Sequence, residues 1–243
     1  MTGGRLVNDD VTRLRRGWRR FADCVYSVRR NGPRGTLQNA AAFIEDAWFD
    51  RAHGTETSRV IEIAELDVPS ANKRFGTEYR PSRVRAFHKL MAHLRLPAGR
   101  VFVDFGCGKG RILCAAAGHP FSRVVGVEFA PELCAICRDN LAAYRARRRP
   151  HGVLSVEEGD VLEYGFRGDE DVLFFFTPFR PSVMTALMAR IHASLRTHPR
   201  DMLLIVSNSD ALAATLEGDP VFRQIDEYRY GSTHFHIHAN RTH

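Results

Sequence analysis

The sequence of 243 residues lacks any long hydrophobic run. No apolar stretch approaches the roughly 20 residues that a helix needs to cross a bilayer, which excludes a membrane span. The start of the sequence also lacks the apolar core of a signal peptide, because five arginines occupy those positions: Arg13, Arg15, Arg16, Arg19 and Arg20. We therefore expect a cytoplasmic protein.

Cysteine is scarce, and the count of five is odd. A small disulfide-stapled secreted domain needs a denser, paired set, so reduced thiols are the expectation. Cys134 and Cys137 form a C-x-x-C pattern, but Pro131 just before them marks a predicted helix start. We therefore expect buried small side chains one helical turn apart, and not a redox or zinc pair.

Repeats, low-complexity tracts and Pro/Gly/Ser linkers are also missing, and charge is unevenly spread. Residues 1–100 hold 19 Lys and Arg against 11 Asp and Glu, whereas the remainder is close to neutral. Apolar residues recur at helical spacing between the arginines of residues 11–25, which predicts a basic amphipathic helix. We expect that helix to pack on the domain, to help form a substrate site, or to bind an anionic partner such as RNA or a membrane surface. We divide the chain into a helical N-terminal extension (1–95) and a second domain (96–243).

Strand and helix patterns alternate from residue 101 onward. Apolar, β-branched runs predict strands at 101–105, 123–128, 153–160, 171–177 and 201–207, with helical patterns between them. Residues 222–230 and 232–240, separated by Gly231, predict an antiparallel pair. This order indicates an α/β fold of the Rossmann-like, doubly wound type, with a mostly parallel sheet and a C-terminal hairpin.

Three alternating glycines, Gly106, Gly108 and Gly110, lie where the first predicted strand turns into a helix. Glycine permits a tight bend and lets a ligand approach the main chain without a Cβ in the way. In doubly wound sheets this turn lies at the ligand-binding crevice, beside a helix N-terminus with free N–H groups. The spacing is G-x-G-x-G, whereas the dinucleotide fingerprint is G-x-G-x-x-G.

Acidic residues accompany the glycines at consecutive strand ends. Asp104 precedes the turn, where a carboxylate disfavours a pyrophosphate but suits a ligand that carries an ammonium and a sulfonium. Glu128 ends the second strand and can accept two ribose hydroxyls, and Asp160 follows the third strand and can accept from an adenine amino group. This set predicts S-adenosyl-L-methionine as the cofactor.

The motifs VDFGCGKG, GVEFAPEL and EGDVLEY resemble the successive cofactor motifs of class I S-adenosylmethionine-dependent methyltransferases. The resemblance implies a seven-stranded sheet that ends in an antiparallel hairpin. The segments FVDFGCGKGR and GVEFAPELC, together with the upstream segments FDRAHGTET and YRPS, are also similar to a bacterial branch of that class. That branch implies upstream loops that close over the cofactor, with Thr57 and Tyr79 as the residues to do so.

The resemblance places the reacting methyl group near the end of the fourth strand, at Thr177, Pro178 and Phe179. Amino-methylating relatives have N-P-P-Y/F there, and the similar branch has N-P-F. Thr177 replaces the Asn, and a hydroxyl cannot reproduce the paired donor and acceptor of an amide. Support for nucleic-acid adenine methylation is thereby reduced, and N- and O-methylation of a small molecule or a protein side chain both stay open. The protein is expected to be a monomer or homodimer.

Three histidines, His234, His236 and His238, alternate along the last predicted strand and therefore share one face. Such a face can bind zinc, but the sequence places no carboxylate beside it, and methyl transfer needs no metal, so we predict none. Two alternative functions remain. One is a nicotinamide-dependent oxidoreductase, and the other is a non-catalytic cofactor-binding module whose basic extension binds RNA or a partner protein.

Overall fold

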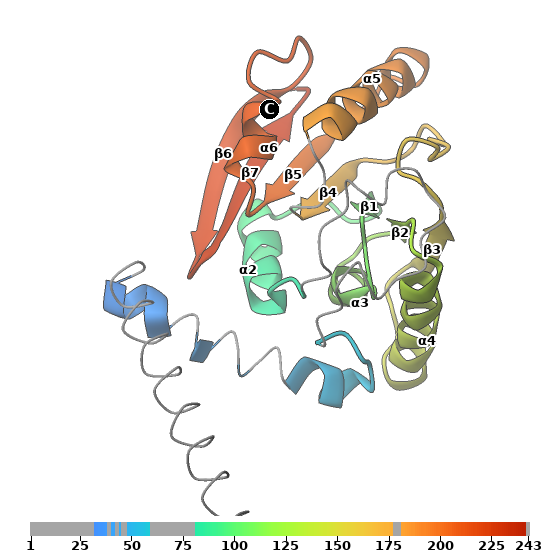
Figure 1. Ribbon diagram of the computed structural model, residues 1–243, viewed down its shortest axis with the longest axis vertical. Coiled ribbons are helices and arrows are strands. Elements are labelled where there is room, and N and C mark those ends of the chain that lie inside the picture. Colours follow the sequence, from blue (N-terminus) through green and yellow to red (C-terminus); the bar gives the residue numbers. More distant parts are fainter. Residues whose placement is uncertain are drawn as a thin grey trace, which may run out of the picture.

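One seven-stranded sheet forms the centre of the computed structural model, in the order β3-β2-β1-β4-β5-β7-β6 (Figure 1). The structure describes residues 32–37, 40–41, 44, 48–58, 81–176 and 181–241. The strands are β1 (Val101–Phe105), β2 (Arg123–Glu128), β3 (Val153–Glu158), β4 (Val172–Phe176), β5 (Leu203–Ser207), β6 (Arg223–Tyr230) and β7 (Thr233–Ala239). Strands β1 to β5 run parallel, and β7 pairs antiparallel with both β5 and β6.

Helices cover both faces of this sheet. They are α2 (Val84–Leu94), α3 (Arg111–Ala116), α4 (Pro131–Arg147), α5 (Pro181–Thr197) and α6 (Asp210–Ala214), and residues 32–37 and 48–53 are also helical. Because side chains alternate along a strand, Phe102 of β1 packs into a core with α2, α3 and α4, whereas Val103 packs into a second core with α5 and α6. None of the helices that the structure describes is both long and apolar enough to cross a membrane.

The strand order reverses between β1 and β4. β2 and β3 extend the sheet on one side of β1, and β4 and β5 extend it on the other. In an open parallel sheet, the crevice outside the carboxyl ends of the strands at such a point is the usual ligand site. The glycine turn that follows β1 therefore lies where the sequence predicted a ligand.

The predicted strands, the parallel sheet and the C-terminal hairpin are all confirmed, with bounds that shift by a few residues. The predicted helix at 11–25 lies outside the described residues. Phe49 and α2, which we assigned to the N-terminal extension, pack into the same core as α3. The boundary between residues 95 and 96 stays a prediction.

Candidate cofactor site

The turn after β1 has a backbone that glycine makes possible. Gly106, Gly108 and Gly110 have φ angles of +81°, +53° and +78°, in the left-handed region that other residues rarely adopt. The N–H of Gly106 donates to the carbonyl of Val127 at 2.8 Å, which ties the turn to the end of β2. A Cβ on Gly110 would lie 2.5 Å from the sulfur of Cys137 on α4, so the turn also packs too closely for a side chain there.

The carboxylate of Glu128, at the end of β2, holds this turn in place. It accepts hydrogen bonds from the backbone N–H of Gly108 at 2.9 Å and of Ala130 at 3.0 Å. Burial raises the pKa of Glu128, and the backbone hydrogen bonds offset part of that effect. A carboxylate has about four acceptor sites, so Glu128 can also accept from a hydroxyl of a bound ribose.

Asp104, near the end of β1, is a buried carboxyl group with 3% of its surface exposed. None of the residues that the structure describes donates a hydrogen bond to its carboxylate. Burial, together with the charge of Glu128, raises the pKa of Asp104 to about 8. A buried acid without a donor is stabilised by a cation, and the ammonium and sulfonium of S-adenosyl-L-methionine fit that requirement.

Asp160 completes the row of acids, two residues after β3. Its Oδ1 accepts from the N–H of Leu162 at 2.9 Å, and the N–H of Gly159 donates to the carbonyl of Glu128 at 2.9 Å. Since β3, β2 and β1 are neighbours in the sheet, Asp160, Glu128 and Asp104 follow one another along a single edge. The structure thus brings the three predicted acids and the three glycines to the same edge.

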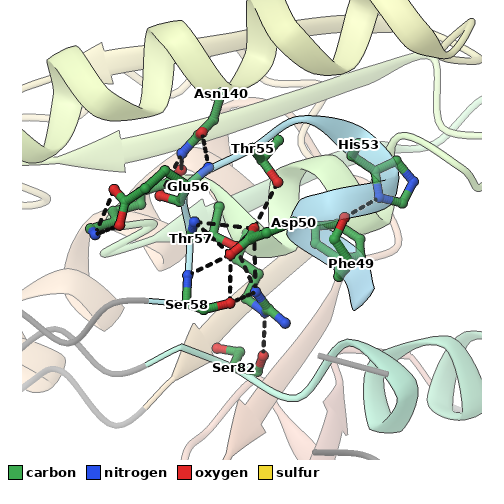
Figure 2. A network of polar contacts seen from close by, with 11 residues as sticks. Phe49, Asp50, His53, Thr55, Glu56, Thr57, Ser58, Ser82 and Asn140 are labelled. Atoms are coloured by element: carbon green, nitrogen blue, oxygen red, sulfur yellow. Dashed lines mark hydrogen bonds and ion pairs between the residues drawn. The ribbon is translucent and has the colours of Figure 1, made fainter. Parts of the chain in front are cut away.

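A segment from the N-terminal part of the chain, residues 48–58, docks against this turn (Figure 2). Its own fold is organised by the carboxylate of Asp50, which accepts from the hydroxyls of Thr55, Thr57 and Ser58 and from the N–H groups of Thr57 and Ser58. Burial alone would raise the pKa of Asp50, but the hydrogen bonds outweigh it and lower that pKa below its usual range. Asp50 is therefore ionised at neutral pH.

Three side chains of the cofactor domain bind the docked segment, and the sequence analysis missed them. The ammonium of Lys109, inside the glycine turn, lies 2.8 Å from the carboxylate of Glu56. Arg111, at the start of α3, donates to the hydroxyl of Thr57 at 2.6 Å and to the carbonyl of Ser82 at 3.1 Å. Asn140 of α4 accepts from the N–H of Glu56 at 2.7 Å and donates to its carbonyl at 3.2 Å.

Lys109 and Arg111 are buried, which the sequence alone did not indicate. Arg111 is 2% exposed, and its guanidinium carbon lies 5.0 Å from the ring centroid of Phe49. In the sequence, these two residues are marked only by their position on either side of Gly110, just before an apolar helix. Their partners lie more than 50 residues away in sequence, so the pairs themselves have no local pattern.

The remaining predicted site residues divide into two groups. Thr57 is buried, and its hydroxyl donates to Asp50 and accepts from Arg111, so the structure places it in the docking contact beside the turn. Tyr79 and the predicted acceptor-side residues Thr177, Pro178 and Phe179 lie outside the described residues. β4 ends at Phe176, beside the end of β1, and those three residues follow it in sequence.

The cysteines near the turn are buried, as predicted. Cys134 and Cys137 lie on α4, one turn apart, and Cys107 lies in the glycine turn. Burial raises the pKa of Cys107 well above its usual range and that of Cys134 to about 12. The thiols of Cys107 and Cys134 are therefore protonated at neutral pH, which suits packing and not nucleophilic chemistry.

Comparison with known proteins agrees with this geometry. The family model described as "Methyltransferase domain" matches residues 102–198. A histone H3 lysine-79 N-methyltransferase of Dictyostelium discoideum is 26% identical over 193 residues, which are 68% of this chain and 10% of that protein. A ribosomal protein L11 methyltransferase of Thiobacillus denitrificans is 34% identical over 104 residues, which are 43% of this chain and 32% of that protein. The chain therefore spans a third or less of the length of these two relatives.

Among solved structures, yhhF of Escherichia coli, assigned as a methyltransferase, superposes with a TM-score of 0.50 at 16% identity. The match covers 74% of this chain and 98% of that one, and it shows a shared fold. A methyltransferase fold agrees with the strand order, the hairpin, the acid-bordered glycine turn and the family match. Residues 102–198 thus match the model of a methyltransferase domain, and the sheet has the Rossmann-like fold of class I methyltransferases, a family that uses S-adenosyl-L-methionine.

Proposed function

We propose that this protein transfers a methyl group from S-adenosyl-L-methionine, in line, to a nitrogen or oxygen nucleophile of a protein side chain or a small molecule. The single observation that carries the proposal is the buried Asp104 carboxyl, which has a raised pKa and lies beside a glycine turn held by Glu128. An acid in that state favours a cationic ligand over a pyrophosphate. Two curated relatives are named for protein acceptors, which is why we place a protein side chain first.

In the proposed mechanism, the residues of this chain bind and position the cofactor and the methyl acceptor. Asp104 balances the positive charge of the cofactor, Glu128 and Asp160 bind its ribose and adenine, and Thr177, Pro178 and Phe179 border the reactive methyl. When bound, S-adenosyl-L-methionine supplies a methyl group that its sulfonium already activates. The protein therefore contributes mainly proximity and alignment, which are worth up to about 7–11 kcal/mol in the best intramolecular models.

The docked segment 48–58 has a part in this proposal. Glu56 and Thr57 of this segment contact Lys109 and Arg111, and these contacts hold the segment beside the glycine turn. The polar network of the segment is drawn in Figure 2. We assign Thr57 and Tyr79 to the closure of the cleft over the cofactor. Exclusion of water by such a closure protects the reacting groups and strengthens the electrostatic contacts inside.

A thermal-shift measurement with S-adenosylhomocysteine tests cofactor binding. At 100 times its dissociation constant, the ligand should add about 2.7 kcal/mol of stability to the parent protein. Glu128→Ala should lose most of that shift. Glu158→Ala is the matched control, because Glu158 ends the neighbouring strand and its carboxylate only pairs with Arg138 at an exposed site, 2.9 Å away. A parent that shows no shift would remove the proposal.

Transfer itself is tested with a donor labelled in its methyl group. Label should enter either the protein fraction or the low-molecular-weight fraction of a cell extract, and Glu128→Ala should abolish it in both. Incorporation into protein would identify a side-chain acceptor, and incorporation into the small-molecule fraction would identify the other class. A protein that binds S-adenosylhomocysteine but labels neither fraction would be a non-catalytic cofactor-binding module.

A further inference from the structure

Two histidines and an aspartate converge at the opposite half of the sheet, away from the glycine turn. His234 and His236 lie on β7, and Asp210 is the first residue of α6. The Oδ1 atom of Asp210 is 3.1 Å from Nδ1 of His234 and 2.9 Å from Nε2 of His236. The sequence analysis found no carboxylate for these histidines, and Asp210 is the one that the fold supplies.

The loop between β5 and α6 is fixed so that Asp210 faces β7. Asn208 has a φ of +53°, its Oδ1 accepts from the N–H of His234 at 2.8 Å, and its own N–H donates to the His234 carbonyl at 2.8 Å. The hydroxyl of Ser209 then caps the N–H of Leu212, at 3.2 Å. Two residues on from Asn208, Asp210 therefore occupies a defined place beside His234 and His236.

A second carboxylate approaches the cluster from β6. Glu227 is the register partner of His236, and its Oε1 lies 2.7 Å from Nε2 of His234. A neutral imidazole carries one proton. Nε2 of His234 is buried without a hydrogen bond of good geometry, so Glu227 faces the ring as a nearby negative charge. Two carboxylates, Asp210 and Glu227, therefore face one imidazole, and a cation bound between Asp210 and the histidines offsets their negative charge.

The donor set suits a zinc-type cation. The three ligand atoms, one from each residue, lie within 4.8 Å of one another. Tetrahedral zinc with bonds of about 2.0–2.1 Å has ligand atoms roughly 3.3 Å apart, so the two spacings from Asp210 to the histidines need to widen by only a few tenths of an ångström. The Asp210 side chain is 82% exposed, which leaves a further coordination position open to solvent.

We propose that Asp210, His234 and His236 bind one divalent transition-metal cation of the zinc type, and that Glu227 orients His234 from behind. A carboxylate that accepts from the second nitrogen of a metal-bound histidine is the usual supporting arrangement in such sites. Three protein ligands with one open position are typical of zinc sites that stay accessible to a small ligand. The site goes beyond methyl transfer, which needs no metal.

Zinc binding by the full chain, free of any histidine tag and kept reduced, tests the proposal. After equilibrium dialysis against low-micromolar free zinc, mass spectrometry of the metal content should give one zinc ion per parent chain. Glu227→Gln should weaken binding by about 10–100-fold, and Asp210→Ala by at least as much. His192→Gln is the matched control, because His192 also pairs with an aspartate, Asp219, at 3.1 Å, but with no second histidine.

Two readouts separate this site from adventitious binding and from misfolding. Cobalt in place of zinc should give an absorption spectrum without a sulfur-to-cobalt charge-transfer band, because the ligands are nitrogen and oxygen. Asp210→Ala should keep the thermal shift with S-adenosylhomocysteine, which shows that it folds and that the two sites are independent. A parent without bound zinc, zinc content that Asp210→Ala leaves unchanged, or a sulfur band would each overturn the proposal.

Discussion

Gly110 offers a sharp test of how the glycine turn is packed. Its φ of +78° is unfavourable for alanine, and a Cβ there would lie 2.5 Å from the sulfur of Cys137. The Cys137 side chain is fully buried in the core, which limits how far it can turn away from the new Cβ. Gly110→Ala therefore combines two costs, one from the backbone conformation and one from the clash.

The two costs can be estimated separately. A left-handed conformation costs alanine about 1–2 kcal/mol, and overpacking of a core typically costs about 1–3 kcal/mol. We expect Gly110→Ala to lower the free energy of unfolding by roughly 2–5 kcal/mol. Gly99→Ala is the control, since Gly99 has a φ of +87° with nothing within 4 Å of the Cβ position. It should lose only the backbone part, about 1–2 kcal/mol.

A double mutant isolates the clash. When Cys137 becomes alanine, the nearest atoms to the new Cβ are Leu113 Cδ1 at 3.6 Å and the Cβ at position 137 at 3.7 Å, which are ordinary contacts. Urea unfolding of the parent, both single variants and Gly110→Ala/Cys137→Ala should give a favourable coupling of about 1–3 kcal/mol. If Gly110→Ala costs no more than Gly99→Ala and the coupling is zero, α4 does not pack against the turn as described.

Four further predictions concern the charged residues of the turn and of the docked segment. Because the pKa of Asp104 is about 8, the affinity for S-adenosyl-L-methionine should rise from pH 6 to pH 8, by up to about tenfold per pH unit. Calorimetric titration should show this pH dependence in the parent protein and not in Asp104→Asn. In the protein without ligand, the pKa of Asp104 in the folded state lies above its value of about 3.9 in the unfolded state. The free energy of unfolding should therefore fall as the pH rises from the unfolded-state pKa to the folded-state pKa, and Asp104→Asn should not show this loss. For Asp50 the pH dependence of stability has the opposite sign, because its pKa is lowered in the folded state and its carboxylate stabilises the fold above about pH 4. Urea unfolding should show that this contribution disappears as the pH falls further, and Asp50→Asn should lack this pH-dependent loss. Arg111→Lys cannot reproduce the guanidinium's contacts to Thr57 and Ser82, so it should cost about 2–4 kcal/mol and expose residues 48–58 to proteolysis, whereas equal digestion rates would refute the docking.

Much of the fold was predictable because its signals are local. The apolar runs of β1 and β4 lie between loops and alternate with helical patterns, and a strand buried on both faces needs such a run. The hairpin was also visible, since Gly231 separates two alternating segments. The end of the third strand was predicted two residues too long, at Asp160, because hydrophobicity does not mark where pairing stops.

The site was only partly predictable because its remaining contacts are non-local. Glycines and strand-end acids carry their meaning in their position, so Asp104 and Glu128 could be assigned from the sequence. The docking of Glu56 on Lys109 spans 53 residues, and that of Asp210 on His236 spans 26. Such pairs depend on the sheet order and on one loop conformation, neither of which has a signature in the side chains themselves.

The sign of the charged groups that are available to a ligand at the turn separates the proposed methyl transfer from the nicotinamide-dependent alternative. A dinucleotide needs positive groups and free N–H donors toward its pyrophosphate. Here the two cations of the turn, Lys109 and Arg111, bind the docked segment through Glu56 and Thr57. The Gly108 N–H already donates to Glu128, and the groups buried at the strand ends are Glu128 and Asp104. An edge with its cations engaged elsewhere and two buried acids favours a positively charged ligand, because only such a ligand relieves the cost of keeping those acids together.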